Sequence, residues 1–111
     1  MVLSVMFRIV EFVEGGLSPF ADWFNELDGV AAARVDRQIR RLEAGNFGSA
    51  KPVREGVFEV VMDFGPGYRV YYGVEGKTVV VLLGGGAKRK QQRDIEAAIE
   101  RWRRYKRSEA R

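Results

Sequence analysis

The sequence has 111 residues, of which 46% are apolar and 31% are charged, with a net charge of +4 at pH 7 and with neither Cys nor His. A chain of this size supports one hydrophobic core, so we expect a single domain over residues 1–111. The absence of Cys and His excludes disulfide bonds, thiolate or conventional zinc sites and a Ser–His–Asp triad, and we expect no cofactor and no metal.

The first residues of the chain are apolar, but they do not resemble a targeting signal. The stretch MVLSVMFRIVEF includes Arg8 and Glu11, and it lacks the charged start and the small-residue cleavage site of a signal peptide. No run of about 18 apolar residues occurs in the sequence, so we expect no membrane span and a cytoplasmic protein. Residues 6–13 are rich in β-branched and aromatic side chains, which predicts a strand.

Two helices are expected next. Ser18 and Pro19 provide an N-cap and a proline at the first helical position. An apolar stripe with helical spacing follows, and we assign it to the core: Phe20, Trp23, Phe24 and Leu27. A second helix is predicted over about 30–44, with its arginines mostly outward: Arg34, Arg37, Arg40 and Arg41. The very short link between the helices predicts an antiparallel hairpin.

Three strands and a last helix complete the predicted fold. Residues 46–56 are expected to form a loop, and strands follow at 57–64, 68–74 and 78–84. The GPG and EGK segments between them are tight-turn sequences, which predicts an antiparallel meander. A C-terminal helix begins near 91–94 and buries one apolar face. The order β-α-α-β-β-β-α predicts an α+β fold, with the helix hairpin packed on one face of a twisted, mostly antiparallel sheet.

Alternation along the strands divides their side chains between two faces. We expect one set to lie under the helix hairpin: Phe58, Val60, Met62 and Phe64. A three-residue turn at 65–67 would place Phe64 opposite Tyr68 and Asp63 opposite Arg69. Four polar residues would then share an open face: Glu59, Asp63, Arg69 and Tyr71. This pattern fits cross-strand salt bridges and solvation, and it also fits a polar, concave binding surface.

The most basic part of the chain begins directly after the last strand. Residues 88–111 contain ten Lys and Arg against four Asp and Glu, and the tail from about 104 is especially basic. Three interpretations remain open: a phosphate site, a surface for a partner, or a solvated helix face. The glycines at 84–86 either form a phosphate cradle at a helix start or let the strand bend, since the sequence has neither nucleotide-binding glycine motif.

Three motifs in a fixed order resemble the RelE/ParE toxin superfamily, and within it the HigB-like "addiction module killer protein" branch. They are IRRLEAGNFG at 39–48, FGPGYRVYY at 64–72 and LLGGGAKRKQQRDI at 82–95, and the resemblance covers about residues 7–103. It implies the small RelE-like fold, which agrees with the predicted order of elements.

The resemblance implies the toxin of a type II toxin–antitoxin system. RelE-type members of the superfamily cleave mRNA on the ribosome, and ParE-type members inhibit DNA gyrase. The HigB-like branch implies a helix-turn-helix antitoxin as the partner, in a toxin–antitoxin hetero-oligomer. We therefore expect a metal-independent mRNA endoribonuclease (mRNA interferase). The alternatives are a gyrase inhibitor or a catalytically impaired homologue that only binds its antitoxin.

The resemblance also implies which residues carry the chemistry. RelE-type nucleases use Lys and Arg side chains, and the matching positions here are Arg69, Lys88 and Arg89. Glu59 is the candidate general base on the same face. Contacts to nucleic acid are expected from further residues: Lys51, Arg54, Tyr71, Lys90 and Arg93. The branch commonly has a basic residue where this chain has Val61, which motivates the impaired alternative.

Overall fold

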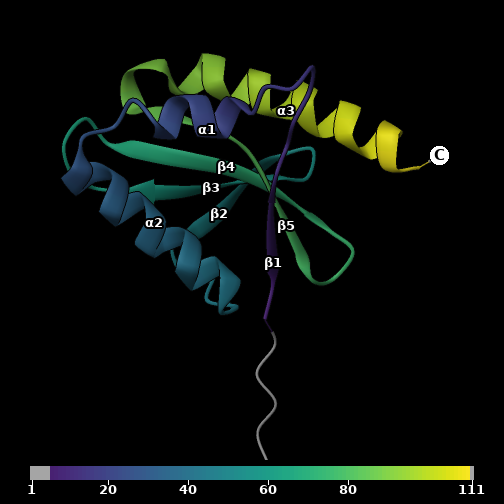
Figure 1. Cartoon of the computed structure of the whole chain (residues 1–111), viewed down its shortest axis with the longest axis horizontal. Helices are drawn as coiled ribbons and strands as arrows, with labels where there is room; N and C mark the ends of the chain where they lie inside the picture. The colour runs from purple at the N-terminus through teal and green to yellow at the C-terminus, as the bar shows by residue number, and fades with distance from the viewer. Residues whose placement is uncertain (1–5, 111) are drawn as a thin grey trace, which may run out of the picture.

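The computed structural model describes residues 6–110, and within them five strands form one sheet with helices on both faces (Figure 1). In chain order the elements are β1 (Arg8–Glu11), α1 (Pro19–Phe24), α2 (Gly29–Glu43), β2 (Ala50–Arg54), β3 (Val57–Met62), β4 (Tyr68–Glu75), β5 (Val79–Ala87), the 3₁₀ turn η1 (Lys88–Lys90) and α3 (Gln91–Glu109). None of the helices in this range is long and apolar enough to cross a membrane.

The sheet has the strand order β1-β5-β4-β3-β2. Strands β2 to β5 form an antiparallel meander, and β1 pairs with β5 in parallel. The predicted α+β class and the mostly antiparallel sheet are confirmed.

Strand β2 corrects the prediction of a loop over 46–56. Ala50 pairs with Val60, and Pro52 pairs with Phe58, at the outer edge of the sheet. An edge strand tolerates proline because the missing N–H would otherwise point to solvent. The segment is therefore held in the sheet by its neighbour β3, and its own sequence carries little strand signal.

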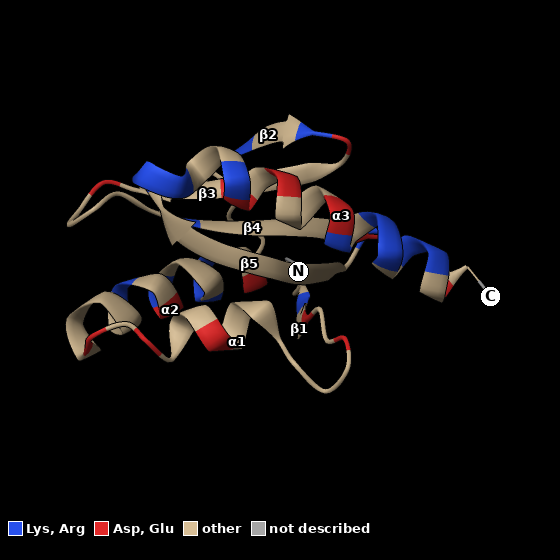
Figure 2. Ribbon diagram, turned by 90° about the horizontal axis from the view of Figure 1, so that it is seen from above, with Lys and Arg blue, Asp and Glu red and all other residues tan. Residues whose placement is uncertain are grey.

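Helices α1 and α2 lie on one face of the sheet (Figure 2). The side chains of Ser18 and Asp28 cap the two helices, accepting from the backbone N–H groups of Ala21 at 3.0 Å and Ala31 at 2.9 Å. The core on this face contains Val60 and Met62 of β3, which were predicted to lie under the hairpin. The other buried residues of this core come from α1, α2, β4 and β5: Phe20, Val35, Ile39, Leu42, Val70, Tyr72, Val80 and Leu82.

Helix α3 covers the opposite face (Figure 2), which corrects the prediction of an open polar surface there. Its apolar side packs on the sheet in a second core: Phe12, Val57, Tyr71, Val81, Leu83, Ile95, Ala98, Ile99 and Trp102. As a result Glu59 and Arg69 are only 4% and 8% exposed. The reason is that the apolar stripe of α3 must be buried, and α1 and α2 already occupy the other face.

The turn between β3 and β4 is longer than the sequence predicted. Met62 pairs with Tyr68 and Val61 with Arg69, so residues 63–67 leave the ladder. The N–H of Gly67 donates to the carbonyl of Phe64 at 3.0 Å, and Gly67 itself has a φ of 74°, in the left-handed region that glycine adopts readily. Asp63 is therefore exposed in the turn, and it does not oppose Arg69.

The ring of Trp102 lies directly against the backbone of β4. A Cβ atom added at Gly73 would lie 2.7 Å from three atoms of that ring. The ring also stacks on Tyr105, with centroids 5.6 Å apart. The close approach of α3 to the sheet therefore requires glycine at position 73.

We expect Gly73→Ala to lower the free energy of unfolding by about 1–3 kcal/mol, because the added methyl group overlaps a buried indole. Gly29→Ala is the control, since a Cβ atom added there would have nothing within 4 Å. It should leave the stability unchanged or raise it by up to about 1 kcal/mol. Urea unfolding followed by tryptophan fluorescence measures both, and equal midpoints would contradict the proposed fit of Trp102.

Candidate nucleic-acid interface

The basic residues predicted to meet a phosphate gather at one end of the sheet, where β5 passes through η1 into α3 (Figure 2). Lys88, Arg89 and Lys90 form η1, and Arg93 follows in the first turn of α3. All of them are exposed, and none forms an ion pair within residues 6–110. Their charges are therefore available to an external anion.

The glycines before η1 serve close packing. Gly84 pairs with Tyr71 and Gly86 pairs with Arg69, so both belong to β5. A Cβ atom at Gly85 would overlap the ring of Trp23, and one at Gly86 would overlap the carboxylate of Asp94. Because η1 also separates these glycines from α3, the structure favours the packing of the strand over a phosphate cradle at a helix start.

A groove of about 340 Å³ lies beside these glycines, and we call it the Trp23 groove. Its lining combines one indole with three cations and two carboxylates: Trp23, Arg89, Lys90, Arg93, Glu26 and Asp94. Sequence analysis placed Trp23 in the core from its helical spacing, yet the structure leaves it only half-buried at the edge of that core. An aromatic ring beside unpaired cations suits a nucleobase and its phosphate.

Arg69 and Tyr71 lie behind the basic turn on β4, and both carry an unpartnered polar atom. Arg69 donates from Nη1 to the carbonyl of Gly67 at 2.6 Å, while its Nε has no partner among the described residues. The hydroxyl of Tyr71 is likewise buried without a partner in residues 6–110. Unsatisfied buried polar atoms are rare and mark positions with a reason other than stability.

Glu59 on β3 belongs to the same buried cluster. It pairs across the sheet with Tyr71, and its two carboxylate oxygens accept from Nε2 of Gln91 at 3.4 and 3.2 Å. Nζ of Lys51 lies 3.9 Å from Oε1 of Glu59. The first residue of α3 therefore holds the candidate base, a role for Gln91 that no sequence motif indicated.

Burial raises the pKa of two groups at this site, Tyr71 and Asp94. Burial raises the pKa of Tyr71 far above its usual value, the charges of Glu59 and Asp94 raise it further, and Arg69 opposes them. The pKa of Asp94 is also raised by burial, against the pull of Arg93 and Lys90. Tyr71 therefore stays a neutral phenol at physiological pH and can act as a hydrogen-bond donor, but not as a base.

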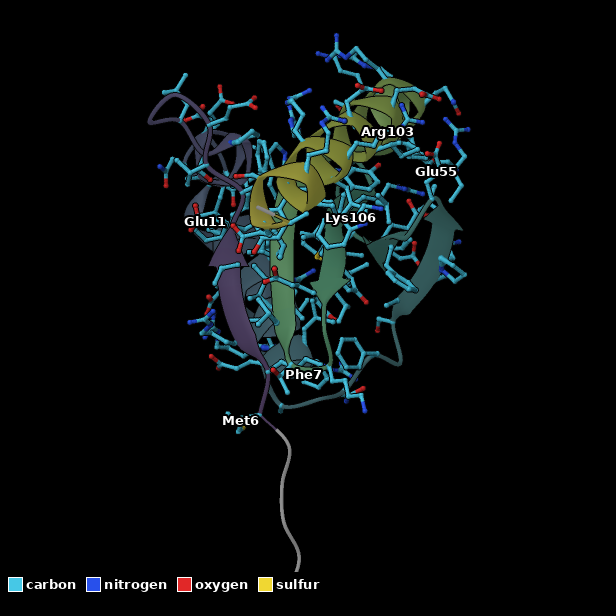
Figure 3. All side chains as sticks on the ribbon, turned by 90° about the vertical axis from the view of Figure 1, so that its right-hand side faces the viewer. Met6, Phe7, Glu11, Glu55, Arg103 and Lys106 are labelled. Carbon is cyan, nitrogen blue, oxygen red and sulfur yellow. The ribbon has the colours of Figure 1, made fainter. Side chains whose placement is uncertain are left out.

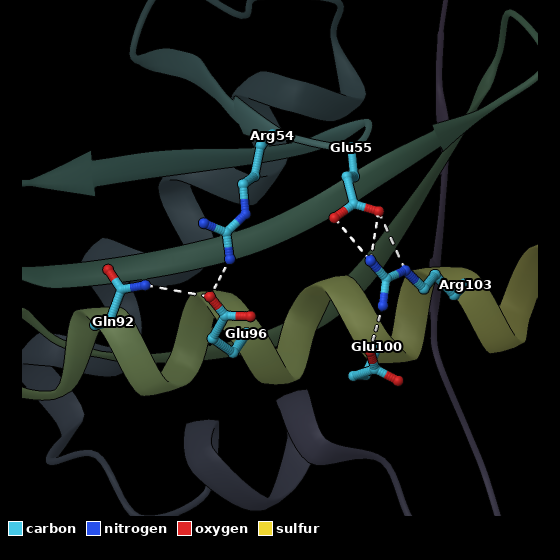
Figure 4. A network of polar contacts seen from close by, with 6 residues as sticks. All are labelled: Arg54, Glu55, Gln92, Glu96, Glu100 and Arg103. Carbon is cyan, nitrogen blue, oxygen red and sulfur yellow. Dashed lines mark hydrogen bonds and ion pairs between the residues drawn. The ribbon is translucent and has the colours of Figure 1, made fainter.

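Arg54, which was predicted to contact nucleic acid, binds a carboxylate of α3 in this structure. Its guanidinium contacts Glu96, which also accepts from Gln92 at 3.2 Å (Figure 4). The structure therefore brings Lys51, Glu59, Arg69 and Tyr71 together on the sheet near η1. Arg54, at the end of β2, lies farther from η1 and contacts Glu96 of α3.

A second ion pair holds the β2–β3 hairpin to α3. Arg103 donates to both oxygens of Glu55, at 2.7 and 2.8 Å, and to Glu100 at 2.5 Å (Figures 3 and 4). The bonds to Arg103 lower the pKa of Glu55. These contacts hold the hairpin against α3. They also pair the charge of Arg103 with carboxylates, so this arginine is not a free cation of a binding surface, as the sequence alone would suggest.

Comparison with known proteins places the chain among phage-related proteins. A family model described as "Phage derived protein Gp49-like (DUF891)" matches residues 22–104. A protein of Haemophilus influenzae named "Uncharacterized protein" is 42% identical over 80 residues, which are 71% of this chain and 81% of that protein. The crystal structure of the toxin–antitoxin complex RelBE2 from Mycobacterium tuberculosis aligns with a TM-score of 0.48 at 16% identity, covering 76% of this chain and 93% of the matched chain.

We expect Tyr71→Phe to raise the free energy of unfolding by about 1 kcal/mol, because it removes a buried hydroxyl without a partner. The folded protein holds the proton of Tyr71 more tightly than the unfolded chain, whose tyrosine pKa is about 10. The free energy of unfolding of the parent is therefore unaffected by the ionisation of this group below that pKa, and it falls as the pH rises toward the pKa of the folded state. The variant should therefore also unfold at a higher pH in alkaline titrations.

Tyr72→Phe is the matched control, since its hydroxyl is not among the buried unpartnered atoms of the described residues. It should change the stability at neutral pH by less than about 0.5 kcal/mol. Urea unfolding at pH 7 measures both variants, and a destabilised Tyr71→Phe would mean that the hydroxyl has a partner.

Proposed function

We propose, because this chain belongs to the phage-derived Gp49-like family of the RelE-like toxin superfamily, that it is the toxin of a type II toxin–antitoxin pair and cleaves mRNA on the ribosome. The match to the Gp49-like family model over residues 22–104 supports the resemblance found in the sequence. The HigB-like branch, the nuclease activity and the ribosome dependence belong to the proposal.

The observation that carries the nuclease assignment is the combination of unpaired cations and a buried arginine at one end of the sheet. Lys88, Arg89 and Lys90 are exposed and form no ion pair within residues 6–110, and Arg69 lies on the strand beside them with an unpartnered Nε. Clustered guanidinium and ammonium groups stabilise the charge of a phosphate under attack. The proposed cleavage needs no other kind of group for that task.

The proposed reaction is transesterification of one phosphodiester bond. The 2′-oxygen attacks the adjacent phosphorus as its proton leaves, and the bond from phosphorus to the 5′-oxygen breaks. The products are a 2′,3′-cyclic phosphate and a 5′-hydroxyl. Arg69 stabilises the charge on the phosphoryl oxygens. Lys88 and Arg89 hold the phosphate, and the ammonium group of Lys88 donates the proton that the leaving 5′-oxygen takes up.

Glu59 is the proposed general base. In the structure its carboxylate accepts from Gln91 and is 4% exposed, so it must exchange this bond for the 2′-hydroxyl of the substrate. Ribosomal RNA can supply part of the geometry that this small set of side chains leaves open. Dependence on the ribosome follows naturally from such a site.

One observation favours the impaired alternative. Val61 lies directly opposite Arg69, at a position where the resembling branch commonly has a basic residue. A site without that charge retains the fold and the antitoxin partner, but it stabilises the phosphoryl charge less. The experiment below separates this alternative from the nuclease.

The proposed partner is a helix-turn-helix antitoxin with an acidic segment. The basic region over 88–111 would bind that segment and mask the site. Its charge is unevenly available, since Arg103 and Arg104 already bind Glu55 and Glu14. The free cations of η1 are the better contacts for a partner, so binding is expected to weaken with added salt.

Expression in a bacterial host, followed by primer extension on abundant mRNAs, tests the proposal. We expect growth arrest with new cleavage sites in translated mRNA. Arg69→Ala should reduce cleavage by about 100-fold or more, since it removes the main charge on the phosphoryl group. Lys88→Ala combined with Arg89→Ala should do the same without disturbing a buried residue.

The control combines Lys77→Ala with Arg107→Ala, which removes the same charge from exposed positions outside the cluster. It should cleave like the parent. Arrest with intact mRNA and inhibited supercoiling would favour the gyrase inhibitor. No arrest from a folded protein would favour the impaired homologue, and full activity of the Lys88/Arg89 variant would show that the assigned site is wrong.

A further inference from the structure

A second basic groove lies on the far side of the β3–β4 turn. Strand β2 pairs with β3 only as far as Val60, so the outer edge of β3 beyond that residue has no neighbouring strand. A hollow of about 310 Å³ occupies this edge, between β3 and α2. We call it the α2 groove, and it is lined by Arg34, Arg37, Gln38, Val61, Met62, Asp63 and Phe64.

The two arginines of the α2 groove keep their charges free. Arg34 and Arg37 are exposed and form no ion pair within residues 6–110, whereas Arg40 on the same helix binds Glu43 at 2.9 Å and lies 3.7 Å from Asp36. The guanidinium of Arg34 lies over the ring of Phe64, 4.6 Å from its centroid. This stacking holds the group in place and leaves its N–H donors available for a phosphate.

The α2 groove continues the basic site around the end of the sheet. The N–H of Lys88 donates to the carbonyl of Pro66 at 3.3 Å, so η1 touches the β3–β4 turn. Phe64, two residues earlier in that turn, carries Arg34. A line of cations therefore runs from the Trp23 groove through Lys88 and over the turn to Arg34 and Arg37. Lys and Arg segments lie at this end on both sides of the sheet (Figure 2).

We propose that the α2 groove binds the sugar–phosphate backbone of the RNA strand that flanks the cleaved bond, through Arg34 and Arg37. The proposal rests on the proposed nuclease function and extends it by a second substrate contact. The free guanidinium groups of the α2 groove match phosphates in charge and shape. The exposed indole edge and the cations that line the Trp23 groove suit a single strand whose bases are unstacked. The α2 arginines thus supply near Val61 the positive charge that β3 itself lacks.

The test uses fluorescence anisotropy of labelled single-stranded RNA of about 4 and about 12 nucleotides, because the longer one is able to span both grooves. Arg34→Ala combined with Arg37→Ala should weaken binding of the longer RNA about tenfold at low salt, and it should reduce the slope of log affinity against log salt by about 1.4. Binding of the shorter RNA should stay within about twofold of the parent.

The control combines Arg41→Ala with Arg107→Ala, which removes the same charge from exposed positions outside both grooves. It should leave the binding of both RNAs close to that of the parent. Equal binding of the longer RNA by the parent and the Arg34/Arg37 variant overturns the proposal, and so does a parent that binds neither RNA. If either result is found and the parent still cleaves mRNA in cells, the nuclease assignment stands and only the role of the α2 groove is rejected.

Discussion

The packing of the Trp102 ring against the backbone of β4 at Gly73 is the contact on which the rest of the molecule depends. Gly73 leaves room for the indole, and this lets α3 lie close enough to bury the second face of the sheet. The same docking brings Gln91 to Glu59 at one end of α3 and Arg103 to Glu55 farther along it. The position of η1, and with it the direction of its basic side chains, follows from where α3 is held.

Docking of α3 also divides the basic charge of the chain into two groups. Along the helix, Arg103 and Arg104 bind carboxylates of the β2–β3 hairpin and of the segment after β1. Glu96 of the helix binds Arg54 of the hairpin, so all three ion pairs hold α3 in place. The cations of η1 at the start of α3, and Arg34 and Arg37 on α2, form no ion pair within residues 6–110. The overall charge of +4 is thus a poor guide to binding, because part of the basic charge is held in ion pairs and the unpaired cations of η1 lie together at one end of the sheet.

Local signals in the sequence predicted most of the elements, because each depends on neighbouring residues. Ser18 and Pro19 begin α1 as expected, and alternation along β3 assigned Val60 and Met62 to the correct face. Strand β2 was missed because its pairing with β3 is a contact between segments. The register beside Arg69 was missed because Gly65-Pro66-Gly67 permits turns of different lengths.

The candidate site was predictable in composition but not in arrangement. The motifs pointed to Arg69, Glu59 and the basic turn, and all of these lie near the same end of the sheet. Their burial under α3, the half-exposed edge of Trp23 and the free arginines of α2 depend on which faces pack together. Helical spacing places Trp23 and Phe20 on the same apolar stripe of α1. Only the structure shows that the Trp23 ring lies against Gly85, where it lines the groove.

The parallel pairing of β1 with β5 has a consequence for the order in which the protein forms during synthesis. Arg8 pairs with Val79 and Glu11 with Leu82, so β1 has no partner strand until a segment some 70 residues later in the chain has been synthesised. Neither core can close before β5 is in place, and α3 follows it directly. The nascent chain therefore holds no assembled basic end until β5 and α3 have both been translated.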